Sequence, residues 1–156
     1  TLWVSGGSGA FRKSIWDKLD GLDPLFNPFY WEDIDLSYRA VKSGYTLVFE
    51  PKSTVLHEHD KGSIKTQRAP QQISARAYRN QFIFIWKNLT DTKLVFEHIV
   101  WLPVHLIKAL FRGDSSYMKG LFNAVGKINE ISISRKKAKR YFKRSDLEVV
   151  ALAPIE

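Results

Sequence analysis

Residues 29–43 read Phe-Tyr-Trp-Glu-Asp-Ile-Asp-Leu-Ser-Tyr-Arg-Ala-Val-Lys-Ser, an aromatic stretch that runs into an acidic, amphipathic segment. From Asp33 to Ser43 the apolar side chains recur with the period of a helix, and Gly44 stands where such a helix would end. The pattern predicts a helix over Asp33–Ser43 with carboxylates in its first turn. An acidic first turn is ordinary in helices because the backbone dipole is positive there, so this feature alone does not indicate a catalytic site.

The two aspartates of this helix are expected to have different roles. At about 100° per residue, Asp33 and Asp35 point about 200° apart and cannot form a symmetric pair. Asp35 precedes Arg39 by four positions, the favourable order for an ion pair on a helix, which predicts a structural role. Asp33 has no such partner, so we expect it to face a cleft beside the aromatic residues, where a carboxylate can act as a base.

Short elements surround the acidic helix in the first part of the chain. Three glycines in Ser5–Gly9 permit close approach of the backbone to a neighbour. A short helix is expected over Ser14–Leu19, and Thr1–Val4 and Ala10–Arg12 are expected to be extended. β-rich residues predict strands over Tyr45–Glu50 and Thr54–His57. The first part of the chain is thus predicted to be rich in short elements and turns.

After a polar segment at Lys61–Pro70, the pattern becomes helical and a second part begins. Helices are predicted over Gln71–Leu89, over 94–111, and from a cap at Asp114 to about Ile131. The segment 94–111 has the length of a membrane span. An amphipathic helix is expected instead, because the segment contains polar residues and a proline: Glu97, His98, Pro103, His105 and Lys108.

The positive charge of the chain lies in this second part. Residues 1–63 hold 7 Lys and Arg against 9 Asp and Glu, or −2, and residues 64–156 hold 17 against 7, or +10, which gives the net charge of +8. Arg135–Arg144 carries 7 basic residues out of 10. Such a surface suits the phosphates of an anionic membrane or of nucleic acid. Alternatively, the apolar helix faces pack on the first part and the basic run is solvated.

The histidines at positions 57 and 59 form a second candidate site. In an extended segment His57 and His59 share a face, so both could bind one metal ion, or one could bind it while the other is solvated. A hydrogen-bonded histidine at a strand end is the alternative without a metal. The chain has no cysteine, which excludes disulfides and thiolate metal sites.

Five separate motifs together resemble the C-terminal half of an inverting family 2 glycosyltransferase, of the type that transfers rhamnosyl or galactofuranosyl groups. The motifs are Ser5–Lys13, Leu19–Asp23, Phe29–Arg39, Lys42–Tyr45, and Pro51 with His57. The resemblance implies a GT-A fold, a Rossmann-like α/β sandwich. On this basis residues 1–63 are expected to be the C-terminal half of a catalytic domain, which binds the acceptor and supplies the base. Residues 64–156 are then a basic, amphipathic helical extension.

The resemblance also implies roles for single residues. Asp33 matches the general base that deprotonates the acceptor hydroxyl, and His57 matches a position that in some members ligates Mg²⁺ or Mn²⁺ at the diphosphate. Nitrogen ligation leans slightly toward Mn²⁺. Four further positions match residues that line the sugar and acceptor pocket: Gly6, Gly7, Trp31 and Glu32.

The chain departs from the family pattern in one large respect. The nucleotide-binding half with its Asp-any-Asp metal motif is absent, so we expect a fragment of a longer protein that is inactive alone. The expected partners are a nucleotide-sugar donor, held mostly by the absent half, and a glycan or lipid-linked acceptor. The expected location is cytoplasmic, peripheral at the inner face of the cell membrane. The alternative is a non-enzymatic basic helical module that binds anionic membrane or nucleic acid, but the nucleic-acid version gives Trp31–Asp35 no purpose.

Overall fold

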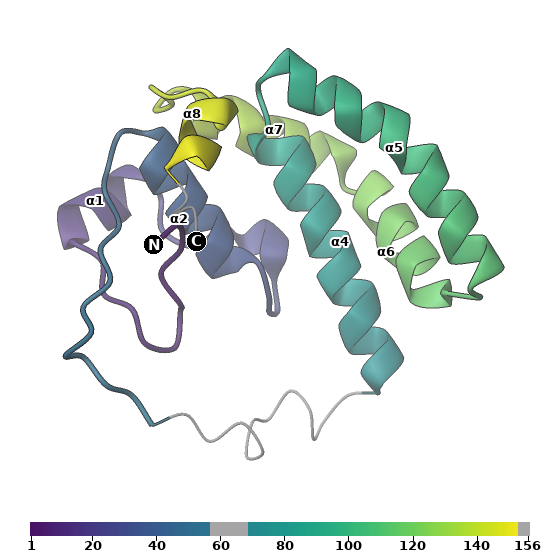
Figure 1. Ribbon diagram of the computed structural model, residues 1–156, viewed down its shortest axis with the longest axis horizontal. Helices are drawn as coiled ribbons and strands as arrows, with labels where there is room; N and C mark the ends of the chain where they lie inside the picture. The colour runs from purple at the N-terminus through teal and green to yellow at the C-terminus, as the bar shows by residue number, and fades with distance from the viewer. Residues whose placement is uncertain (57–68, 153–156) are drawn as a thin grey trace.

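In a computed structural model, residues 1–56 and 69–152 are described, and every regular element in them is a helix (Figure 1). These residues form seven α-helices and one 3₁₀ turn. The elements are α1 (Lys13–Lys18), η1 (Pro24–Phe26), α2 (Glu32–Lys42), α4 (Pro70–Asn88), α5 (Thr92–Phe111), α6 (Ser115–Val125), α7 (Ile128–Lys139) and α8 (Asp146–Ala151). The predicted α/β class is therefore wrong for the part of the chain that the structure describes.

The predicted strands explain this error. The segments 1–4, 10–12, 45–50 and 54–56 form no ladder with any other described residues. An extended segment completes its backbone hydrogen bonds only against a neighbouring strand, and β-rich composition does not supply that neighbour. In a sheet packed on a core, Val48 or Phe49 would face that core, but they are 81% and 76% exposed. Strand-like composition in these segments therefore does not make a sheet among the described residues.

The helices agree with the sequence better than the strands do. Helix α2 begins directly after Tyr30 and Trp31, which both have left-handed φ angles, of 71° and 74°, and Gly44 follows its end with φ of 93°. The carboxylate of Asp114 caps α6 by accepting from the amides of Ser116 and Tyr117, each at 3.1 Å. The single helix predicted up to Ile131 is instead two helices, α6 and α7, separated at 126–127.

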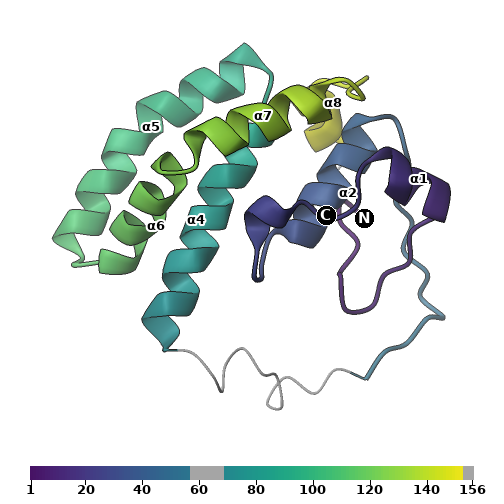
Figure 2. The same cartoon turned by 180° about the vertical axis from the view of Figure 1, so that it is seen from behind.

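The main core lies where α4, α6 and α7 meet. Helix α4 packs along α6, and α7 crosses the end of this pair, as Figure 2 shows from behind. The buried side chains of this core are Phe26, Phe82, Ile83, Leu121, Ala124 and Ile131. Burying one large apolar side chain contributes about 1.5–3 kcal/mol, so this cluster is the main source of stability in the helical part.

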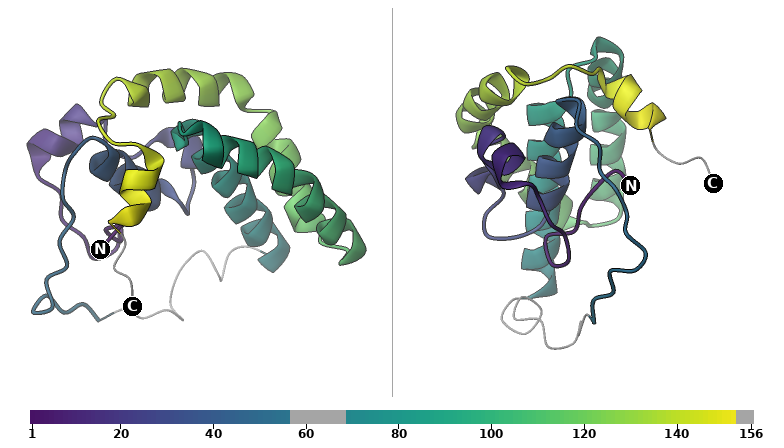
Figure 3. Two further views of the ribbon diagram at one scale, coloured as in Figure 1. Left: turned by 45° about the horizontal axis from the view of Figure 1, so that its top comes forward. Right: turned by 90° about the vertical axis from the view of Figure 1, so that its left-hand side faces the viewer.

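A smaller core joins α1 to α2. Leu19, Leu36 and Ala40 are its buried residues, with Trp16 and Tyr141 packed against them. Helix α8 lies against α2, and Figure 3 shows it beside that helix. Elements on both sides of the polar segment therefore touch α2. Most of the predicted boundary, Lys61–Pro70, lies outside the described residues, and the division at residue 63 stays a prediction.

Candidate active site

The carboxylate of Asp33 is held by one backbone amide at each oxygen. Its Oδ2 accepts a hydrogen bond of 3.0 Å from the amide of Gly6, and its Oδ1 accepts one of 2.8 Å from Ile34. One turn further along α2, Ser37 Oγ accepts from the amide of Val4 at 2.9 Å. The N-terminal segment thus lies along α2, and two predicted site residues, Gly6 and Asp33, meet. Asp33 is half-buried, and its two oxygens have lone pairs beyond those that these two hydrogen bonds use.

Trp31 is the last residue before α2, and Glu32 is the first residue of that helix. The Trp31 ring packs on Phe84, with 5.3 Å between ring centroids, and contributes to the main core. Glu32 Oε2 is buried and has no hydrogen-bond partner among the described residues. Burial, with a smaller contribution from the neighbouring charge of Asp33, raises the pKa of Glu32. Trp31 therefore serves the core, while Glu32 has a buried oxygen without a hydrogen bond among the described residues.

The other predicted site residues are less constrained. Gly6 and Gly7 occupy a turn closed by a 3.2 Å hydrogen bond from the Ser8 amide to the Ser5 carbonyl, and both are exposed. A side chain at Gly6 would contact Asp33 only at ordinary van der Waals distance, 3.6 Å or more. His57 and His59 lie outside the described residues. Gly6 therefore acts on Asp33 through its backbone amide.

The described residues also bear on the expected cation. They contain no group of three His, Cys, Asp or Glu side chains that could hold a metal ion. They do not by themselves fit a site for Mg²⁺ or Mn²⁺. Both the cation and the role of His57 stay predictions, and the chemistry proposed below uses Asp33 alone.

Asp35 is fully buried and has the structural role that its position predicted. Its Oδ2 accepts from Arg39 Nε and from Lys87 Nζ, each at 2.8 Å. Its Oδ1 accepts from Asn88 Nδ2 at 2.8 Å. The guanidinium of Arg39 also donates to the carbonyls of Leu19 and Gly21. The pairing with Arg39 was expected on the helix surface, but the pair is buried, because Lys87 and Asn88 of α4 cover it.

Two neighbouring side chains of α4 hold the loop that leads to Asp33. Asn80 Nδ2 donates to the carbonyls of Phe26, Phe29 and Tyr30 at 2.8, 2.9 and 2.8 Å. Arg79 Nη2 donates to the carbonyl of Asn27 at 2.6 Å. These bonds fix the aromatic loop whose left-handed residues start α2. Sequence reasoning missed this function of Arg79 and Asn80, because nothing local links two polar residues of a helix to carbonyls about fifty positions earlier.

A second buried network joins α2 to α8. Lys42 Nζ donates to Asp146 Oδ1, to Thr90 Oγ1 at 2.7 Å and to the Asn88 carbonyl at 2.8 Å. Tyr38 also donates to Asp146, at 2.6 Å. Burial opposes the charge on Asp146, but hydrogen bonds from Lys42, Tyr38 and two backbone amides outweigh it and lower the pKa of Asp146. The helical extension is thereby attached to the acidic helix by buried polar contacts.

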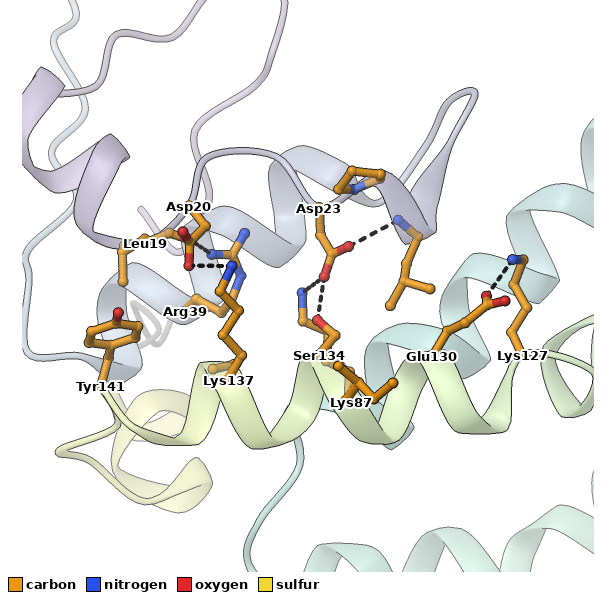
Figure 4. Close-up of a pocket in the computed structure, with 14 residues that line it drawn as sticks. Leu19, Asp20, Asp23, Arg39, Lys87, Lys127, Glu130, Ser134, Lys137 and Tyr141 are labelled. Carbon is orange, nitrogen blue, oxygen red and sulfur yellow. Dashed lines mark hydrogen bonds and ion pairs between the residues drawn. The ribbon is translucent and has the colours of Figure 1, made fainter.

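A cavity of about 540 Å³ opens between α7 and the loop after α1, and Figure 4 shows the side chains around it. Asp23 accepts from Lys87 Nζ at 2.6 Å and from the Ser134 hydroxyl. Burial opposes the charge on Asp23, but Lys87 and the other donors outweigh it and lower the pKa of Asp23. Lys137 pairs with Asp20 at 3.0 Å. The polar groups here pair with one another, and Asp33 is not among the lining residues.

Comparison with known proteins finds the same class of protein that the motifs of residues 5–57 resemble. The chain has partial, distant similarity to a family 2 glycosyltransferase. The matching relatives are N-acetylglucosaminyl-diphospho-decaprenol L-rhamnosyltransferases of Mycobacterium tuberculosis, from strain CDC 1551 / Oshkosh and strain ATCC 25618 / H37Rv. Each is 34% identical over 83 residues, which is 53% of this chain and 26% of the relative. No family model matches the chain, and no solved structure matches it.

Proposed function

We propose that this chain is the acceptor-side part of an inverting glycosyltransferase, with Asp33 as its general base. The observation that carries the proposal is the contrast between the two aspartates of α2. Asp35 is buried and bound by two cations and an amide, whereas Asp33 is half-exposed and is bound, among the described residues, by two backbone amides. One carboxylate stabilises the fold, and the other is free to meet a substrate.

The proposed reaction transfers a sugar from a nucleotide-sugar to an acceptor hydroxyl in one displacement. The hydroxyl oxygen forms a bond to the anomeric carbon while the bond from that carbon to the diphosphate oxygen breaks and the diphosphate takes the electron pair. The hydroxyl proton passes to Asp33. A base within hydrogen-bond reach accelerates such a step by about 10²–10⁴-fold. The amides of Gly6 and Ile34 fix the carboxylate, so that it need not reorient during the reaction.

A lipid-linked glycan is the acceptor class that we propose. The relatives are named for rhamnosyl transfer and for an N-acetylglucosaminyl-diphospho-decaprenol, a sugar on a polyprenyl diphosphate. The aligned segment is only 26% of their length, so the donor-binding part of such an enzyme would have to come from outside this chain. The isolated chain is accordingly expected to show no sugar transfer.

The test is Asp33→Asn in a full-length protein that carries this chain. We expect kcat to fall by about 10²-fold or more, with the midpoint of thermal unfolding unchanged within about 2 °C. The matched control is Asp17→Asn, which removes an exposed carboxylate whose ion-pair partner within residues 1–56 and 69–152 is Lys13, and which should leave kcat unchanged. Turnover by Asp33→Asn equal to that of the control would refute the proposed base.

The alternative of a nucleic-acid-binding module is weakened by the contacts of the basic run. Arg135 Nη1 donates to the carbonyls of Trp86 and Lys87 at 2.8 and 3.3 Å, and Arg144 donates to the carbonyl of Val41 at 3.1 Å. With Lys137 paired to Asp20, several of these cations hold helices together and are not displayed as one phosphate-binding surface.

A further inference from the structure

Helix α5 turns a long apolar surface toward solvent. The outer face of α5 consists of Phe96, Ile99, Val100, Ile107, Leu110 and Phe111, and each of these residues is between 50% and 89% exposed. At about 100° per residue they fall within an arc of about 120°. A monomeric soluble protein rarely leaves so many large apolar side chains together in water, so a partner surface is expected to cover them.

The rest of the helix shows how α5 is oriented on the protein. Leu102 and Leu106 pack against the main core, Ala109 is buried, and His98 accepts a hydrogen bond of 3.0 Å from the Trp86 indole. One side of α5 is thus attached to the bundle, and the outer face lies beside that attached side. In Figures 1 and 2 α5 runs along the margin of the bundle next to α6, which itself exposes Phe122 and Val125.

Basic residues border the outer face on its other side. Lys93, Lys108 and Arg112 follow the same helix at about 60–160° from Phe96, and none of them forms an ion pair within the described residues. The acidic residue among them is Glu97. From residue 92 to 112 the chain holds 3 Lys and Arg against 1 Asp and Glu, or +2. An apolar stripe next to unpaired cations has the pattern of a helix that lies in the surface of an anionic bilayer.

We propose that the outer face of α5 docks on an anionic lipid bilayer, with the helix parallel to the membrane plane. By length and composition α5 is long and apolar enough to cross a membrane, and only 6% of its most apolar window is buried. Lipid on all sides would, however, enclose Glu97 and Lys108 and would remove α5 from α6 and the main core. In-plane docking buries the apolar arc and leaves both the cations and the core contacts in place. The inference rests on this exposed surface and does not depend on the chemistry at Asp33.

The first test is sedimentation of the chain with vesicles of phosphatidylcholine, with or without phosphatidylglycerol. We expect binding to the anionic vesicles that weakens with salt. Phe96→Ser with Leu110→Ser should reduce the bound fraction about tenfold or more, because two exposed apolar side chains no longer enter the bilayer. The matched control is Phe49→Ser with Leu56→Ser, which removes the same two residue types from another exposed region and should bind like the parent.

The second test measures which side of α5 enters the lipid. The chain has no cysteine, so a single introduced cysteine carries a polarity-sensitive fluorophore without further changes. Labels at Ile107→Cys should be quenched by lipid-chain quenchers, and labels at His105→Cys should not. Equal quenching at both positions would indicate a helix surrounded by lipid and would overturn the in-plane arrangement.

Docking on a membrane would be overturned by any of three results. These are absence of vesicle binding, equal binding by the two double variants, and concentration-dependent dimers that Phe96→Ser with Leu110→Ser abolishes.

Discussion

Asp33 and Gly6 are 27 positions apart in the sequence, yet a 3.0 Å hydrogen bond joins the Asp33 carboxylate to the Gly6 amide. The bond is made by the backbone, so the identity of the residue at position 6 does not create it. It depends on the N-terminal segment lying along α2, which the bond from Val4 to Ser37 also supports. The proposed base is therefore oriented by the path of the chain.

The two aspartates of α2 should respond differently to the same substitution. Asp35→Asn should lower the free energy of unfolding by about 3–5 kcal/mol, because it leaves the buried cations Arg39 and Lys87 without this carboxylate. Asp33→Asn should change it by less than about 1 kcal/mol, since the amide oxygen can still accept from Gly6. Urea unfolding of the chain measures both, and similar losses in the two variants would contradict the division of roles.

The division between the aspartates could be predicted from the sequence, but the surroundings of Asp35 could not. The spacing of Asp35 and Arg39 is local and fixes a pairing on one helix. Lys87 approaches from 52 positions away, and its place is decided by how α4 packs. Local patterns therefore gave the pair correctly, but they placed it on the surface although it is buried.

The errors in the fold have equally specific causes. Segment 45–50 has strand-like composition, but composition does not provide a neighbouring strand in the described part of the chain. Helix α8 was not predicted. Its start could have been predicted from the sequence, since Ser145 and Glu148 form a capping box. The break between α6 and α7 follows Gly126, whose low helix propensity was overlooked.

The hydrogen bonds by which Asn80 of α4 clamps the aromatic loop give a second prediction. Asn80→Ala should lower the free energy of unfolding by about 3 kcal/mol, because the buried carbonyls of Phe26, Phe29 and Tyr30 lose their donor. Gln81→Ala changes the next, exposed residue of the same helix and should have little effect. Thermal unfolding separates the two variants. In hydrogen exchange, loss of protection in residues 25–35 of Asn80→Ala alone would show that the clamp orders the approach to Asp33.

Replacing Glu32 or Glu148 by glutamine should change the stability at pH 7 in opposite directions. Burial raises the pKa of Glu32 above 4.5 in the folded state, so its charge destabilises the fold as pH rises through that range. Glu32→Gln should therefore raise the midpoint of thermal unfolding at pH 7, and the gain should shrink toward pH 4.5. Hydrogen bonds from Ser145 lower the pKa of Glu148, so Glu148→Gln should lose stability at pH 7 and lose less as pH falls. Melting curves from pH 7 to 4.5 that show the same sign for both variants would contradict these assignments.

Two glycines of the helical part should respond oppositely to alanine. Gly120 of α6 faces α4 so closely that an added Cβ would lie 2.6 Å from Tyr78 Cβ and 2.9 Å from the Arg79 amide nitrogen. Because the Arg79 amide belongs to the α4 backbone, the helices must separate, and Gly120→Ala should cost about 1–3 kcal/mol. Gly126 has a helical φ of −59°, and a Cβ there would lie 3.6 Å from its nearest neighbour.

Gly126→Ala should therefore stabilise the fold by about 0.4–1 kcal/mol, since alanine restricts the unfolded chain without strain in the folded one. Urea unfolding measures both changes in the same chain. A destabilising effect only at Gly120 would show that close approach of α4 and α6 is required. That approach also fixes Arg79 and Asn80 of α4 over the aromatic loop, so Gly120→Ala should loosen residues 25–31 as Asn80→Ala does. If hydrogen exchange in that loop is unchanged in Gly120→Ala, the packing of α4 on α6 does not control the loop before Asp33.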